Sequence, residues 1–192
     1  MPGVWNVGGE GVAEASQAGV GTAAVADGGD ARTERGHKHS FILQVVQPGL
    51  AGLMDGSVST LAPLFAVAFA THNTHTTFVV GLAAAVGAGI SMAFAEGLSD
   101  DGTLTGRGSP LLRGLIIGLM TFVGGVGHSL PFLMPNIHTA LIIAYLVVAT
   151  ELIAIAVIRN RYFGTKMWLS VIQVVFGGAL VFLAGVAIGS RG

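Results

Sequence analysis

The sequence contains no cysteine and very little charge. Without cysteine the chain can form no disulfide bond, no thiolate metal site and no cysteine nucleophile. Only 10% of its 192 residues are charged, whereas a soluble domain carries about 25%. The net charge of −1 and the lack of a basic stripe give no support for a nucleic-acid partner. With 52% hydrophobic residues and a mean hydropathy of +0.75, the chain is predicted to reside in a lipid bilayer.

Two regions differ sharply in composition. Residues 1–40 are rich in Gly and Ala and poor in large apolar side chains, so we expect a flexible N-terminal tail. Residues 41–190 alternate long apolar runs with short polar breaks, and each run approaches the roughly 20 residues that cross a bilayer as a helix. This pattern predicts an all-α membrane domain with five transmembrane helices, at 47–70, 77–98, 110–132, 137–158 and 167–189.

Basic residues fall almost entirely on one side of the predicted helices. Of the nine Lys and Arg residues, only Arg191 lies on the other side. The rest precede the first helix or lie at the second and fourth connections between helices. By the positive-inside rule, the N-terminus is therefore cytoplasmic and the C-terminus is outside.

Three carboxylates lie within the apolar runs, at Asp55, Glu96 and Glu151. An ionised side chain at membrane depth costs at least about 2.5–3.5 kcal/mol, so it is rarely incidental. All three fall toward the cytoplasmic side, which predicts a common level and a polar cavity open to the cytosol. Met92 lies one helical turn before Glu96 on the same face, and a thioether beside carboxylates favours a softer transition metal. These four side chains are the candidate metal-binding residues.

Each candidate also has a structural interpretation. Met92 could face lipid or fill the core, Asp55 could be a hydrogen-bonded structural acid, and Glu151 lies about two turns from basic residues near the interface. Four histidines near the predicted outer ends could receive a metal on exit, because neutral imidazole binds iron, manganese and zinc, although loop histidines are usually solvated. These are His72, His75, His128 and His138.

Small residues recur at a spacing of four, as at Gly114 and Gly118, and predict close helix packing rather than a site. The sequence contains no glycine-rich phosphate loop, no HExxH pair and no Ser-His-Asp set with credible context. We therefore expect no enzyme.

Two motifs resemble those of the vacuolar iron transporter family. GLMDGSVSTLAPLFA contains Asp55, and GAGISMAFAEGLSDDG contains Met92 and Glu96. The family pairs a DGxVS/T motif in its first helix with a motif close to GAISMAxGEYxS in its second. The similarity runs from Phe41 to Ser190. Within the family, the sequence most resembles the bacterial branch, in which a ferritin-like domain precedes the membrane domain of an iron exporter.

The resemblance implies a homodimeric transporter that exports Fe2+ or Mn2+ from the cytoplasm by proton exchange. It implies that Asp55 and Met92 line the path, that Glu96 receives the ion at the cytoplasmic end, and that the protein lies in a bacterial inner membrane. The metal is cargo, and no cofactor is expected. Vacuolar members carry a long glutamate-rich insert between the second and third helices, whereas this chain has SDDGTLTGRGS, with Asp100 and Asp101. No ferritin-like sequence precedes the first helix here.

Two other functions are compatible with the same residues. The chain could be a membrane anchor or assembly subunit without transport activity, in which the buried acids are paired structurally. It could also be a small exporter of another solute, with the acids acting as proton relays.

Overall fold

The computed structural model describes residues 36–99, 101–102, 106–164 and 166–191. The chain divides into two units, residues 1–37 and 38–192. The first unit contributes only Gly36 and His37 to the described residues, so the predicted Gly/Ala-rich tail lies almost wholly outside them. Asp100 lies outside them as well.

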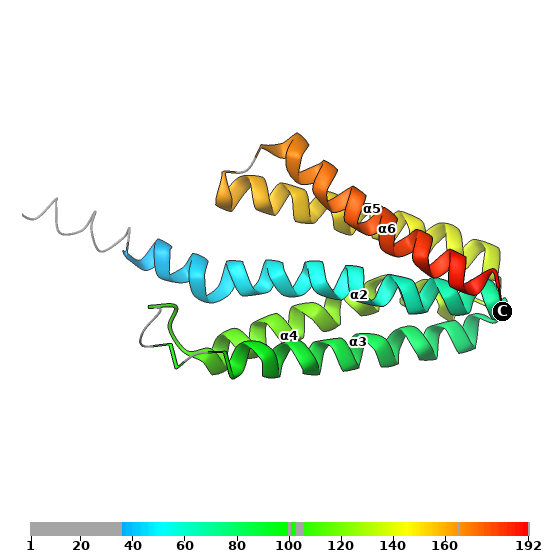
Figure 1. Cartoon of the computed structure of the whole chain (residues 1–192), viewed down its shortest axis with the longest axis horizontal. Coiled ribbons are helices and arrows are strands. Elements are labelled where there is room, and N and C mark those ends of the chain that lie inside the picture. Colours follow the sequence, from blue (N-terminus) through cyan, green and yellow to red (C-terminus); the bar gives the residue numbers. More distant parts are fainter. Residues whose placement is uncertain (1–35, 100, 103–105, 165, 192) are drawn as a thin grey trace, which may run out of the picture. The chain divides into compact units, whose positions relative to one another are not determined.

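Five long helices make up the second unit, as the hydropathy pattern predicted, and all five are long and apolar enough to cross a membrane (Figure 1). They are α2 (Gln47–Thr71), α3 (Thr74–Gly97), α4 (Pro110–Gly127), α5 (Ile137–Phe163) and α6 (Met167–Gly189). Two short segments accompany them, the π-helix η1 (Ile42–Val46) before α2 and the 3-10 helix η2 (Leu130–Leu133) after α4. The described part of the chain contains no strand.

Asparagine side chains cap the starts of α3 and α5, and a glycine ends α5. Asn73 caps α3 by accepting the backbone N–H of Thr76 at 2.9 Å, and Asn136 caps α5 in the same way. Such a cap satisfies one of the N–H groups that the first helical turn leaves without an intrahelical partner. At the other end of α5, Gly164 adopts φ 62°, a conformation that favours glycine and ends the helix.

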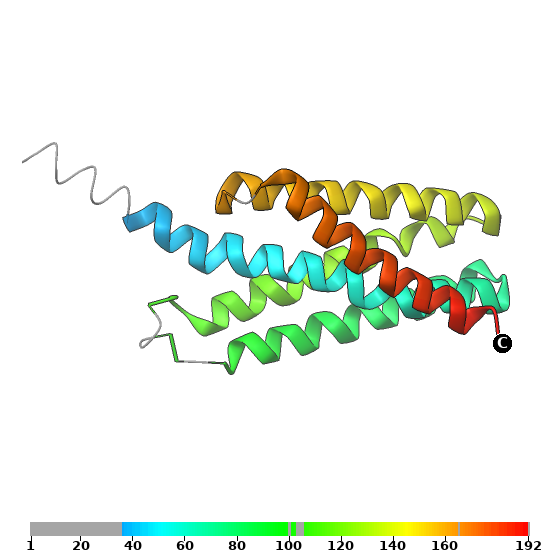
Figure 2. The same ribbon diagram turned by 45° about the horizontal axis from the view of Figure 1, so that its top comes forward.

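α2 lies between the pair α3 and α4 on one side and the pair α5 and α6 on the other (Figures 1 and 2). Glycine lets α2 approach α4 to backbone contact. A Cβ atom on Gly52 would collide with the carbonyl oxygen of Ile117, and one on Gly56 would collide with that of Thr121. Close contacts of this kind are a main source of helix association in lipid.

The regularly spaced small residues of α3 and α4 pack as predicted. A Cβ atom on Gly114 would lie 2.7 Å from the carbonyl oxygen of Ala93, and one on Gly89 would lie 2.9 Å from that of Gly118. These glycines therefore support the packing of α3 against α4.

α4 differs from the helix that the sequence predicted over 110–132. It ends at Gly127 after 18 residues, a length of about 27 Å against a hydrocarbon core of about 30 Å. The hydroxyl of Ser129 donates to the carbonyl of Gly125 at 2.9 Å, and Pro131 has no N–H with which to continue the helix. The end of α4 lies within the bundle, where Gly125 contacts Thr60 midway along α2.

Aromatic packing holds α2 against α5 and α6. Phe65 is buried, and its ring stacks on Tyr145 at a centroid distance of 5.3 Å. The same ring meets Phe182 edge-on at 5.0 Å. Around Phe65 lies an apolar core of Leu61, Leu64, Ala68, Phe132, Ala140 and Ala144.

We call one end of this unit the basic end, because the described basic residues other than Arg191 gather there. Its members are Lys38, Arg107, Arg113, Arg159, Arg161 and Lys166. The placement of the basic end in the cytoplasm stays a prediction from the positive-inside rule.

Candidate functional site

Asp55 lies in the first half of α2 and is half-buried. Within the described part of the chain its carboxylate makes no hydrogen bond and no ion pair. Ala51 and Ser59, one turn to either side on the same face, are small and exposed. The carboxylate is therefore accessible on one face of α2 and lacks the partners that usually stabilise an acid at membrane depth.

Glu96, at the end of α3, is held by two arginines. Its Oε1 accepts Nε of Arg113 at 2.7 Å and Nη2 of Arg107 at 2.9 Å. The Arg113 side chain is fully buried and also donates to the carbonyl of Gly108 at 3.2 Å. This cluster joins the end of α3 to the start of α4, and its two guanidinium groups oppose the approach of another cation. A role for Glu96 in receiving metal stays a prediction.

Glu151 projects from the middle of α5 toward α2 and the end of α4. Its Oε2 accepts the hydroxyl of Ser57 at 3.0 Å and lies 3.3 Å from Nδ1 of His128. Gly127 leaves room for the carboxylate, since a Cβ atom there would collide with Oε1. Glu151 therefore joins three helices, α2, α4 and α5.

His128 continues this network to Thr60. The ring is fully buried, and its Nε2 lies 2.6 Å from Oγ1 of Thr60. The Thr60 hydroxyl donates its single proton to the carbonyl of Gly56 at 2.7 Å, so Nε2 is the donor to Thr60. On the other side of the ring, Nδ1 faces the Glu151 carboxylate at 3.3 Å. We call Ser57, Thr60, His128 and Glu151 the buried polar network.

The sequence did not reveal this network. It placed His128 near an outer helix end, where it could receive a metal on exit or be solvated, whereas the residue caps the end of α4 inside the bundle. The available signal was the string GGVGHSLP, where glycines and a proline interrupt an apolar run beside a polar side chain.

Glu96 lies at a different level from Asp55 and Glu151, so the predicted common level is wrong for Glu96. Gly52 of α2 lies beside Ile117 of α4, and Gly89 of α3 lies beside Gly118, so these two glycines are at about the same level along the bundle. Asp55 is three residues beyond Gly52, away from the basic end, and Met92 is three residues beyond Gly89, toward the basic end. At about 1.5 Å of rise per residue, Asp55 and Met92 are therefore about 9 Å apart along the bundle. From the basic end, the order is Glu96, Met92, Asp55 and then Glu151 beside Ser57.

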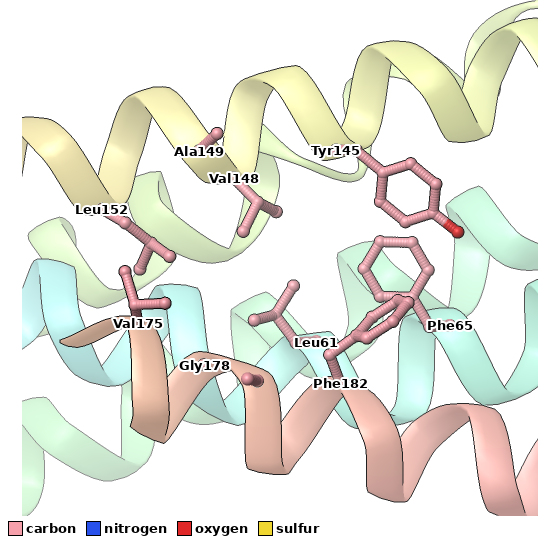
Figure 3. A pocket seen from close by; sticks show the side chains of 10 residues that line it. Leu61, Phe65, Tyr145, Val148, Ala149, Leu152, Val175, Gly178 and Phe182 are labelled. Carbon is pink, nitrogen blue, oxygen red and sulfur yellow. The ribbon is translucent and has the colours of Figure 1, made fainter. Parts of the chain in front are cut away.

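The described residues contain no group of three His, Asp or Glu side chains that could hold a metal ion. A cavity of about 240 Å³ between α2, α5 and α6 is lined by apolar and aromatic side chains, and the hydroxyl of Tyr145 is the polar atom that Figure 3 shows there. None of the four candidate metal residues lines it. Its lining is unsuited to a cation.

The fold is that of a polytopic helical membrane protein, and one of its spanning helices carries an acid without a partner among the described residues. The model of the VIT family matches residues 97–190, and the chain belongs to this family of metal-ion transporters. The match runs from the end of α3 through α6, so it includes His128 and Glu151 and leaves Asp55 outside. No curated protein and no solved structure matches the chain.

Family membership confirms the resemblance that the motifs of the first two helices indicated. It also agrees with a membrane transporter that is not an enzyme. The relation to the bacterial branch with a ferritin-like domain stays a prediction.

Proposed function

We propose that the protein exports Fe2+ or Mn2+ from the cytoplasm along a path that includes Asp55 and Met92. The observation that supports this most directly is the state of the three acids. Glu96 and Glu151 have partners, whereas Asp55 has none within the described residues. An unpaired carboxylate in a spanning helix is available to a cation, and a thioether about 9 Å away along the bundle favours softer divalent metals.

The order of the groups along the bundle fits movement from the basic end outward. Metal that enters at the basic end passes the level of Met92 before that of Asp55. Glu96 and Glu151 take part in this path only if their present bonds open, because both hold positively polarised donors. The proposed driving force is exchange against protons, in a bacterial inner membrane.

One chain supplies too few ligands for a divalent cation at Asp55. A second copy provides a second Asp55 carboxylate, and one divalent cation then balances the two negative charges. Ala51 and Ser59 border Asp55 with small exposed side chains, which allows the two α2 helices to approach closely. The proposed transporter is therefore a homodimer with paired α2 helices.

The proposal is tested by metal uptake into proteoliposomes that contain a metal-sensitive dye. Asp55→Asn keeps the shape of the side chain and removes its charge, and we expect it to abolish uptake of Fe2+ and Mn2+. Met92→Leu keeps the volume and removes the sulfur, and we expect it to reduce uptake of Fe2+ more than that of Mn2+. Equal uptake by the wild type and Asp55→Asn would exclude Asp55 from the transport path.

A membrane anchor without transport is the second candidate, because the structural pairing of Glu96 and Glu151 is what that function predicts. The two functions differ at Asp55. A transporter takes up metal and loses this uptake when Asp55 becomes Asn, whereas an anchor takes up no metal with either residue. Uptake of a solute that no metal stimulates would support an exporter of another kind.

A further inference from the structure

We propose that His128 is a positioning residue for transport, which holds the turn of α2 that carries Asp55 in one rotational setting. The inference rests on the proposed function for its transport readout, whereas its structural readout is independent of that function.

His128 occupies a position from which one side chain reaches two helices. α4 ends at Gly127, and His128 follows as its C-cap within the bundle. Nε2 bonds Thr60 of α2, and Nδ1 bonds Glu151 of α5. The ring is fully buried, so water does not replace these bonds if α2 turns away.

The buried polar network bonds α2 at two residues on the same face. His128 bonds Thr60 directly, and Glu151 bonds Ser57 through Oε2. Ser57 and Thr60 are three residues apart and therefore share a face. At about 100° per residue, Asp55 lies about 140° from Thr60 and about 160° from Ser57 around the helix axis. Bonds to this face therefore direct Asp55 away from α4 and α5.

The backbone of α2 is least able to hold this setting by itself near the network. Pro63 has no N–H, so the carbonyl of Ser59 lacks its usual intrahelical donor. Gly56 contacts the backbone of Thr121 closely. The bonds from His128 and Glu151 add directional restraints on the same segment of α2.

The lack of cysteine allows a direct test of this role. A single cysteine introduced as Ser59→Cys lies on the Asp55 face of α2, which is exposed in one chain and faces the second copy in the proposed dimer, so its rate of modification by a thiol reagent reports how that face is set. The matched control is Ala83→Cys, an exposed position on α3. Both are measured in the full chain in proteoliposomes, with native His128 and with His128→Ala.

We expect His128→Ala to change the labelling rate at position 59 by at least about fivefold and to leave the rate at position 83 unchanged. His128→Gln can reach Thr60 as Nε2 does, and we expect it to restore most of the native rate. In transport, His128→Ala raises the KM for Fe2+ or Mn2+ by at least about fivefold, because Asp55 is misplaced. Thr60→Val, which removes one bond at constant volume, changes each value in the same direction by a smaller factor.

Unchanged labelling at position 59 in both His128→Ala and Thr60→Val contradicts the inference. A similar change at positions 59 and 83 contradicts it as well, because that result shows general loosening. If His128→Ala does not fold, Thr60→Val decides the question alone. If Asp55→Asn transports metal normally, the proposed function fails, but a selective change at position 59 still supports the positioning role of His128.

Discussion

Glu96 has two possible roles, joining α3 to α4 or receiving the metal ion, and a variant that removes its charge distinguishes between them. Glu96→Gln leaves the shape of the side chain and removes the charge that pairs with Arg113 and Arg107. Removing one member of a buried ion pair costs about 3–5 kcal/mol. The Arg113 side chain is 0% exposed but keeps its bond to the carbonyl of Gly108. We therefore expect the free energy of unfolding to fall by about 3 kcal/mol, the lower end of that range.

The matched control is Arg107→Gln, which removes the more exposed partner. The Arg107 side chain is 29% exposed, and exposed ion pairs contribute about 1 kcal/mol or less. Reversible unfolding in mixed micelles of a mild detergent and dodecyl sulfate, followed by circular dichroism, measures both variants. Equal and small losses for Glu96→Gln and Arg107→Gln would refute the assignment of the buried pair as the stabilising element.

Uptake by the same Glu96→Gln protein then tests the sequence-based role in metal capture. If Glu96 only joins α3 to α4, uptake per folded molecule stays close to that of the wild type. If Glu96 receives the ion, uptake falls even when the loss of stability is small. The two measurements together give different results for the two roles.

Three further predictions concern packing and topology. Gly56→Ala places a methyl group against the carbonyl of Thr121 and should lower the free energy of unfolding by about 1–3 kcal/mol or more. In Gly177→Ala the added methyl group meets nothing within 4 Å, so the stability should be unchanged or higher. Chemical unfolding compares the two variants, and equal effects would contradict the close approach of α2 and α4. Phe65→Ala should cost about 3–5 kcal/mol by the same assay, while Tyr145→Phe keeps the stacked ring and should cost less than about 1 kcal/mol. A phosphatase reporter fused to the C-terminus should be active outside the cytoplasm; activity only in a cytoplasmic reporter would reverse the orientation.

The helices followed from the sequence because hydropathy and end signals act locally. α6 has the bounds that its apolar run predicted, 167–189. α5 continues to Phe163, five residues beyond the predicted end, because a helix can extend past its apolar run until a residue such as Gly164 with φ 62° ends it. α4 stops early for the opposite reason, since glycines and Pro131 interrupt its hydrogen bonding within an apolar run.

The site was predictable only in part, because the partners of an acid come from distant parts of the chain. Asp55 and Glu96 were recognisable as acids in apolar helices, and their motif indicated the family. The sequence did not show that Arg113, 17 residues away, bonds Glu96. It also did not show that Ser57, 94 residues from Glu151, meets it across the bundle. These pairings depend on the order in which helices pack, which periodicity alone does not determine.

The charge balance of the spanning region explains why Asp55 differs from the other acids. Among the described residues, the carboxylate of Glu151 accepts the Ser57 hydroxyl and faces Nδ1 of His128, and that of Glu96 pairs with Arg113 and Arg107. Asp55 has no such partner there, and its cost of at least about 2.5–3.5 kcal/mol per protomer is not offset by another group of the same chain. In the proposed dimer, two ionised Asp55 carboxylates carry two negative charges, which one divalent cation neutralises. When the cation leaves, the same balance is restored only by two other positive charges, which is the physical basis of the proposed exchange against protons.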